Sequence, residues 1–167
     1  MYISNRVFFA IISASCLSLL AYGYYLEFSE DLLPCPMCIF QRLGYMAITL
    51  ASLIAVIQAP QRTGGITYGV LIIVFSTIGA SIAGRQTWLQ HIPPGLVPEC
   101  GPGLEFMLEM YPLLGTIERA LLGTGDCAAV SWTFISMSIA EWSLICFIGL
   151  LVVALYQTIS NWRTVTV

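Results

Sequence analysis

The chain has 167 residues, which is enough for one domain. Hydrophobic residues make up 58% of the chain and charged residues only 9%, whereas a typical soluble domain carries roughly 25% charged residues. With a mean hydropathy of +0.87, this composition excludes a soluble enzyme, a disordered chain and a nucleic-acid-binding protein, which would need a basic surface. It indicates an integral membrane protein.

Four apolar segments follow one another along the chain, and each matches the roughly 20-residue helix that crosses a bilayer. Backbone groups in lipid must form hydrogen bonds within their own segment, and no barrel-like alternation is present, so we predict helices. The first segment exceeds the roughly 7–15 apolar residues of a signal peptide, so we expect it to be retained. The predicted fold is an all-α membrane protein, a single domain over 1–167 with a bundle of four transmembrane helices at 7–26, 39–57, 66–84 and 142–160.

The distribution of arginine predicts which side of the membrane each loop occupies. Four spans place both termini and the loop 58–65 on one side, and this side carries no acid but holds Arg6, Arg62 and Arg163. Basic residues in short loops mark the cytoplasmic side, so both termini are predicted to be cytoplasmic. All nine acidic residues then fall on the opposite side, in the linker 27–38 and in the long loop 86–141.

The loop 86–141 is too long for a simple connection, and loops of this length are usually functional or disordered. A short stretch at 113–122 has apolar residues spaced along one helical face, so we predict an amphipathic helix there. Two placements remain open for this helix: flat on the membrane surface, or packed on the ends of the spans.

Four of the six cysteines lie on the predicted outer side of the membrane: Cys35, Cys38, Cys100 and Cys127. The other two, Cys16 and Cys146, lie inside apolar spans, where cysteine packs well as a small hydrophobic residue. We therefore expect chemistry only from the four outer cysteines.

The first outer pair forms a Cys-Pro-Met-Cys motif where the second span begins. Pro36 suits the first position of a helix because its missing N–H would have no partner there, which makes Cys35 the cap. The positive end of the helix dipole favours a thiolate and raises the reactivity of Cys38 in the first turn. Two thiols at this spacing can close a small disulfide that is easily reduced.

Arg42 follows Cys38 by four residues, so the two side chains share one helix face. A charge just inside the hydrocarbon boundary is costly and suggests a function. Two interpretations remain open. Arg42 stabilises a Cys38 thiolate or the anion of a bound electron acceptor, or it extends to the lipid headgroups.

The second outer pair, Cys100 and Cys127, lies in turn-rich parts of the long loop, so both thiols are expected to be exposed and mobile. A structural disulfide is the simplest alternative. A zinc site is not predicted, since structural zinc usually has two close pairs of ligands and only one is present. Four cysteines permit three pairings, and their spacing selects none of them.

Two cysteine pairs on the outer side of a membrane protein suggest electron transfer. A thiol partner can meet the loop pair, electrons can pass by thiol exchange to the pair at the helix start, and a lipid-soluble quinone can accept them. His91, the only histidine, is predicted near the same interface, where it can donate a hydrogen bond to a quinone carbonyl or carry protons. The alternative is an ordinary polar surface residue.

The chain resembles DsbB, a family of bacterial inner-membrane proteins that form disulfide bonds. The resemblance covers nearly the whole chain and rests on the four spans together with a set of motifs. These are Pro-Cys-x-x-Cys with Arg42 four residues beyond its second cysteine, the segment 86–91 that ends at His91, Cys100, Gly125-Asp126-Cys127-Ala128, and Trp132 ahead of Glu141-Trp142.

The resemblance implies a quinone-dependent oxidoreductase that reoxidises a DsbA-like periplasmic protein of the thioredoxin fold. It implies that Cys100 forms the mixed disulfide with this partner and that Cys127, once released, exchanges with Cys35. Cys38 would then carry the thiolate that faces the quinone beside Arg42, with ubiquinone or menaquinone of the membrane pool as the acceptor. The long loop, with its amphipathic helix, would lie in the periplasm.

Two other classes of protein remain open. One is another membrane thiol oxidoreductase, of the vitamin K epoxide reductase type, in which the quinone-proximal motif comes late in the chain rather than at the second span. The other is a non-enzymatic membrane scaffold with two structural disulfides, which leaves Cys-Pro-Met-Cys followed by Arg42 unexplained. Substitution of Cys38 separates these classes, because only an enzyme would lose electron transfer.

Overall fold

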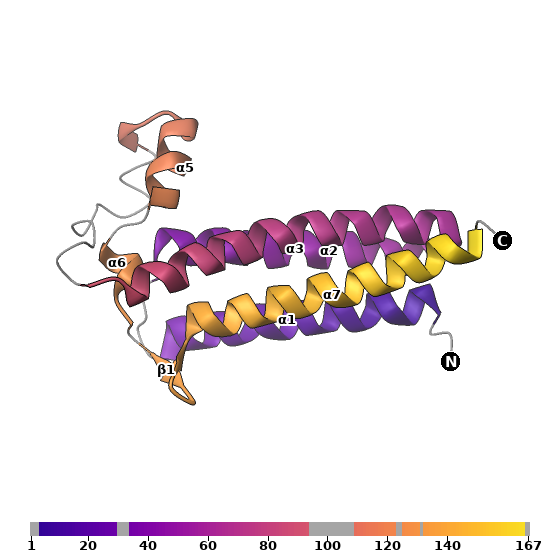
Figure 1. The fold of residues 1–167 in the computed structure, drawn as a ribbon, viewed down its shortest axis with the longest axis horizontal. Helices are drawn as coiled ribbons and strands as arrows, with labels where there is room; N and C mark the ends of the chain where they lie inside the picture. The colour runs from indigo at the N-terminus through magenta and orange to yellow at the C-terminus, as the bar shows by residue number, and fades with distance from the viewer. Residues whose placement is uncertain (1–3, 30–33, 94–108, 123–124, 131, 166–167) are drawn as a thin grey trace.

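The computed structural model describes residues 4–29, 34–93, 109–122, 125–130 and 132–165 of the chain (Figure 1). Four long helices run alongside one another: α1 (Asn5–Ser29), α2 (Pro36–Gln58), α3 (Arg62–His91) and α7 (Ile139–Val165). Each contains a stretch long and apolar enough to cross a membrane. The all-α four-span fold predicted from the sequence is therefore confirmed, and every helix extends past the apolar segment that predicted it.

The four long helices pack in the order α1, α2, α3 and α7, with the most extensive contact between α3 and α7. The beginning of α1 and the end of α7 lie at the same end of the bundle, as an even number of spans requires (Figure 1). Short elements gather at the opposite end: α5 (Leu113–Leu122), α6 (Gly125–Ala128) and a hairpin of β1 (Thr133–Phe134) with β2 (Met137–Ser138). The two cysteine-bearing segments that the structure describes on the predicted outer side are at this end.

The helix α5 is the amphipathic helix predicted at 113–122, and its bounds match that stretch. It lies next to α2, but Leu114, Ile117 and Leu121 remain accessible, with Leu114 83% exposed. Both placements considered for it, on the membrane or on the ends of the spans, stay predictions.

Aromatic packing ties three of the long helices together. Phe147 on α7 is fully buried, and its ring stacks on Tyr45 of α2 with 4.1 Å between the ring centroids. The ring fits because Gly79 of α3 has no side chain: a Cβ there would lie 2.7 Å from Cδ1 of Phe147 and closer still to two other ring carbons. Small residues let membrane helices approach closely in this way. The contact holds the side chain of Tyr45, which lies on α2 two helical turns beyond the cysteine motif.

A second, smaller buried cluster lies at the end of the bundle that carries the short elements. It joins the start of α2, the end of α3 and α6 through Cys35, Met37, Leu89 and Cys127. Two of these four buried side chains are cysteines predicted to carry the chemistry.

Candidate active site

The start of α2 has the local structure that its sequence predicts. Cys35 is the N-cap in an extended conformation, Pro36 follows in the first turn, and the Sγ of Cys35 accepts a hydrogen bond from the backbone N–H of Cys38 at 3.3 Å. An N-cap side chain satisfies one of the free N–H groups at the beginning of a helix. Both sulfur atoms therefore lie at the positive end of the helix dipole, which favours a thiolate.

Three cysteines meet at this helix start. The Sγ atoms of Cys35 and Cys38 lie 2.7 Å apart, and the side chain of Cys127 forms a hydrogen bond with Cys35. Cys100, the fourth cysteine of the predicted site, lies outside the described residues. In the described part of the chain, no three side chains of His, Cys, Asp or Glu are grouped to hold a metal ion.

Cys127 corrects one expectation from the sequence. Its turn-rich surroundings predicted an exposed and mobile thiol, but the side chain is fully buried. The reason is that α6 packs against the end of α3, which places Cys127 beside Leu89 and the start of α2. The burial places the loop cysteine against the helix-start pair.

The surroundings of Cys35 favour its protonated thiol. The pKa of Cys35 is raised above its ordinary value, first by the hydrogen bond with Cys127, then by the hydrogen bond with Cys38 and by burial. A raised pKa keeps the thiol protonated at neutral pH. The Sγ of Cys38 accepts a hydrogen bond from the side chain of Gln86, while the backbone N–H of Cys38 at the helix start donates to the Sγ of Cys35.

Two buried glutamine side chains surround the sulfur atoms. Nε2 of Gln86, on α3, lies 3.3 Å from the Sγ of Cys35 and 3.3 Å from the Sγ of Cys38. Oε1 of Gln86 accepts a hydrogen bond of 2.7 Å from Nε2 of Gln41, one turn into α2. Buried polar groups need hydrogen-bond partners, and these contacts provide partners for both buried amides.

A cavity of about 360 Å³ opens beside the cysteine motif, between α1 and α7. Its polar wall contains Cys35, Cys38, Gln41, Arg42 and Gln86. The remaining wall is formed largely by aliphatic and aromatic side chains, among them Leu20, Leu26, Tyr45, Trp132, Phe134 and Trp142. This volume falls within the range of roughly 300–1,000 Å³ that small-molecule sites occupy, and the mixture of walls is typical of them.

Arg42 lies on the cavity wall, as expected from its spacing after Cys38, but it has an acidic partner that the sequence did not indicate. Its guanidinium forms an ion pair with the carboxylate of Glu27, at the end of α1. It also donates to the backbone carbonyl of Gly23 at 3.2 Å and lies over the ring of Tyr24 at 4.7 Å from the centroid. The positive charge of Arg42 is therefore offset locally, within contacts that bind α1 to α2.

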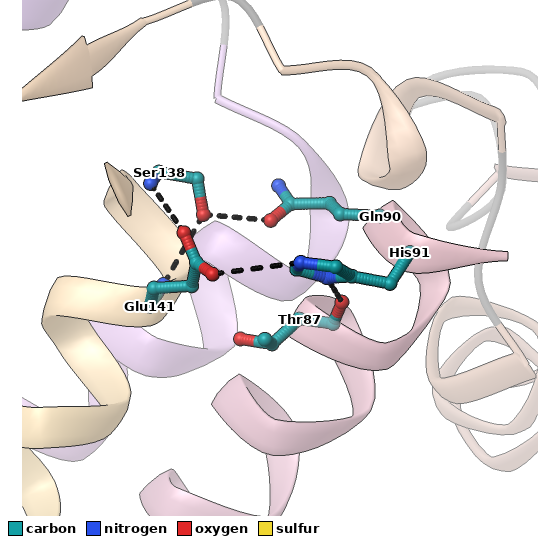
Figure 2. Close-up of polar contacts among 5 residues, drawn as sticks. All are labelled: Thr87, Gln90, His91, Ser138 and Glu141. Carbon is teal, nitrogen blue, oxygen red and sulfur yellow. Dashed lines mark hydrogen bonds and ion pairs between the residues drawn. The ribbon is translucent and has the colours of Figure 1, made fainter. Parts of the chain in front are cut away.

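His91 is absent from the described residues that line the cavity. Its imidazole is 66% exposed, with Nε2 3.7 Å from Oε1 of Glu141 and Nδ1 2.8 Å from the carbonyl oxygen of Thr87 (Figure 2). The ring points toward the start of α7, and its role toward a quinone stays a prediction.

A capping box begins α7 and ties it to α3 (Figure 2). The N–H of Ser138 donates to Oε2 of Glu141 at 2.6 Å, and the N–H of Glu141 donates to the Oγ of Ser138 at 3.2 Å. The same hydroxyl donates to Oε1 of Gln90 at 2.7 Å. Because Ser138 and Gln90 both line the cavity, this network fixes two sides of its wall relative to each other.

Reasoning from the sequence missed several residues of this site. Gln41 and Gln86 lie within or at the end of apolar helices, and polar side chains in such places are commonly functional, so a signal was present. The spacing of Ser138 and Glu141 is the sequence signature of a capping box. Glu27 carries no comparable signal, because its partner is 15 positions away in the chain.

Comparison with known proteins identifies relatives of the chain. Residues 5–157 match a protein family described as disulfide bond formation protein DsbB. The chain is 42% identical over 153 residues to disulfide bond formation protein B of Azoarcus sp., with 92% of each chain covered. It is 46% identical over 154 residues to the protein of that name from Methylococcus capsulatus, covering 92% of this chain and 94% of the relative. The chain therefore belongs to the DsbB family of disulfide bond formation proteins.

Proposed function

We propose that this multi-pass membrane protein oxidises a DsbA-like periplasmic dithiol protein and passes the two electrons to a membrane quinone. Membership of the DsbB family supports a role in disulfide bond formation. One observation carries the proposal: Cys127 contacts Cys35, and Cys35 and Cys38 line a cavity of ligand size. A cysteine of the long loop, an acceptor pair and a small-molecule site are then adjacent.

The contact between Cys127 and Cys35 supports direct thiol exchange between the two pairs. In the proposed sequence, a thiolate of the partner attacks Cys100 of a Cys100–Cys127 disulfide, which forms a mixed disulfide and releases Cys127. The Cys127 thiolate attacks Cys35 of the Cys35–Cys38 disulfide, so that a Cys127–Cys35 bond forms and Cys38 leaves as a thiolate. The helix dipole and the amide of Gln86 stabilise that leaving sulfur.

Completion of the exchange returns the loop disulfide and leaves the other pair reduced. The second thiol of the partner displaces Cys100, and Cys100 then attacks Cys127 and frees Cys35. The net reaction is a dithiol plus a quinone giving a disulfide plus a quinol, which balances two electrons and two protons. The proton held by Cys35 is one of the two that must leave the pair.

The residues around the cavity fit a quinone. Aromatic and aliphatic side chains suit the ring and its apolar tail, and N–H donors for carbonyl oxygens come from the polar wall, where Arg42 and Gln41 lie. When bound, ubiquinone or menaquinone supplies the acceptor for two electrons and two protons. We propose that Arg42 holds the quinone, whereas His91 must turn away from Glu141 to contribute.

The proposed location is the bacterial inner membrane, with both termini in the cytoplasm. The arginines near the ends of α1 and α7 support this orientation, and the short elements at the other end of the bundle would face the periplasm. A soluble thioredoxin-fold partner can meet the cysteines only from that side.

The test uses the purified protein in detergent with excess quinone and a reduced periplasmic dithiol protein, and quinone absorbance is followed with time. We expect reduction by the wild type and by Cys16→Ala, a buried cysteine outside the proposed exchange, but not by Cys38→Ala or Cys100→Ala. If the wild type leaves quinone oxidised while its outer cysteines stay in disulfides, the protein is a scaffold with structural disulfides. If Cys100→Ala retains full activity toward the protein partner, the proposed order of exchange is wrong.

A further inference from the structure

We propose that Gln86 sets the redox balance of the Cys35–Cys38 pair by donating hydrogen bonds to both sulfur atoms, and that Gln41 is a positioning residue that orients Gln86. This inference deepens the proposed function and rests on it. Gln86 approaches the reacting atoms themselves, at 3.3 Å from each Sγ. Gln41 acts through Gln86, to which it donates at 2.7 Å.

The direction of the Gln86 amide follows from its other partner. The oxygen of Gln86 accepts the N–H of Gln41, so the NH₂ group must point the other way, toward the sulfurs. If the amide of Gln86 were turned over, its NH₂ would meet the NH₂ of Gln41. Gln41 thereby holds the amide of Gln86 with its NH₂ group toward the cysteines.

A donor at this position favours the reduced form of the pair. Reduction of the disulfide by two electrons and one proton gives one thiol and one thiolate, and the new negative charge lies on sulfur. Hydrogen bonds to a charged acceptor are roughly twice as strong as those between neutral groups. Since a disulfide sulfur is a weak acceptor, the two N–H groups stabilise the reduced pair more than the oxidised pair, and the disulfide becomes a stronger oxidant.

A neutral amide suits this place better than a cation would. Gln86 is only 4% exposed, and burial of an unpaired charge costs far more than burial of an amide with partners. The nearest cation on the cysteine-bearing face, Arg42, is already paired with Glu27. The amide therefore stabilises charge on the sulfur without introducing a charge of its own.

The experiment measures the equilibrium of the Cys35–Cys38 pair with glutathione, in which disulfide plus two glutathione thiols gives dithiol plus glutathione disulfide. It uses the full chain in detergent, freed of quinone, with Cys100 and Cys127 changed to serine and the state of the pair read by alkylation and mass spectrometry. We expect Gln86→Met to lower the equilibrium constant about tenfold, equivalent to a reduction potential about 30 mV lower. Gln41→Met should lower it in the same direction, by about threefold.

Two comparisons separate this role from simple packing. Gln157→Met removes an amide of α7 at the other end of the bundle, whose nitrogen donates to Asn5 and not to sulfur, so the constant should stay within twofold of the parent. In the double variant, Gln41→Met should add nothing to Gln86→Met, because Gln41 reaches the sulfurs only through Gln86. If Gln86→Met does not fold, Gln41→Met carries the test alone.

The inference is overturned if both single variants stay within twofold of the parent, or if their effects multiply in the double variant. Its failure is distinct from failure of the proposed function, because the equilibrium involves neither quinone nor the protein partner. A pair that exchanges reversibly with glutathione but ignores Gln86 refutes the inference only. A pair that cannot be reduced reversibly in the parent refutes both.

Discussion

Gly79 offers a sharp test of how the bundle holds the site. Gly79→Ala adds one methyl group where α3 meets Phe147 of α7, and the new Cβ would lie 2.7 Å from Cδ1 of that ring and closer to two other ring carbons. The ring has little room to move, because Phe147 is fully buried and stacks on Tyr45 at 4.1 Å. Any shift of the ring is passed to Tyr45, which lines the cavity.

The sign of the effect is decided by two opposing terms. Alanine is favoured over glycine in a helix by about 1 kcal/mol. Overpacking of a tight interior costs about 1–3 kcal/mol, and contacts this close belong at the upper end of that range. We therefore expect Gly79→Ala to destabilise the protein by about 2 kcal/mol, since relief of the clash needs a movement of α7 against α3.

The matched control is Gly149→Ala in α7, where a Cβ would meet nothing within 4 Å and only the helix preference remains. Thermal unfolding in detergent should show a higher midpoint for Gly149→Ala and a lower one for Gly79→Ala. The double variant Gly79→Ala with Phe147→Leu should recover part of the loss, because leucine frees the space that the methyl group needs. A Gly79→Ala protein as stable as the Gly149→Ala protein would refute the packing argument.

Three further predictions follow from the polar contacts. Glu27→Gln should cost about 1–2 kcal/mol of stability in thermal unfolding, because it replaces the carboxylate that offsets the Arg42 cation by a neutral amide. Equal losses from Glu27→Gln with and without Arg42→Gln would contradict this. Ser138→Ala should cost about 1 kcal/mol of stability by the same assay, since it removes the N-cap side chain of α7. A loss under about 0.3 kcal/mol would show that this cap does not stabilise the protein. In the reduced protein, Cys35 should resist alkylation at pH 7 and react only well above pH 8.5, about the ordinary pKa of a thiol, because its pKa is raised. The alkylation rate is measured across pH by mass spectrometry of the Cys35 peptide, and a rate that reaches half its maximum at or below about pH 8.5 would contradict the prediction.

The helices and the helix-start motif were predictable from the sequence because their causes are local. Twenty apolar residues in lipid have few alternatives to a helix, and a proline after Cys35 fixes where α2 begins. The position of Cys38 in the first turn follows from the same few residues. Such features depend on neighbours in the chain, so no knowledge of the packing is required.

The surroundings of the cysteines were not predictable in the same way. The pairing of Arg42 with Glu27 joins two helices, and the contact of Gln86 with Cys35 spans 51 positions, so both depend on how the helices pack. The burial of Cys127 likewise depends on α6 meeting the end of α3. Turn-rich sequence describes the local chain around Cys127 correctly but carries no information about what covers it.

The arrangement of the site separates two tasks that the sequence seemed to assign to one residue. Arg42 lies one turn beyond Cys38, and its spacing left open whether its charge stabilises the Cys38 thiolate or the anion of a bound acceptor, or extends to the lipid headgroups. In the structure that charge is offset by Glu27, while the sulfur of Cys38 is met by the amide of Gln86 and the backbone N–H of Cys38 donates to the sulfur of Cys35. These donors face the two sulfur atoms directly, and fixed dipoles of this kind stabilise charge in a low-dielectric site at little cost in reorganisation. The ion pair holds Arg42 at the wall of the cavity, where the proposed quinone would bind, and α1 contributes to this position through Glu27.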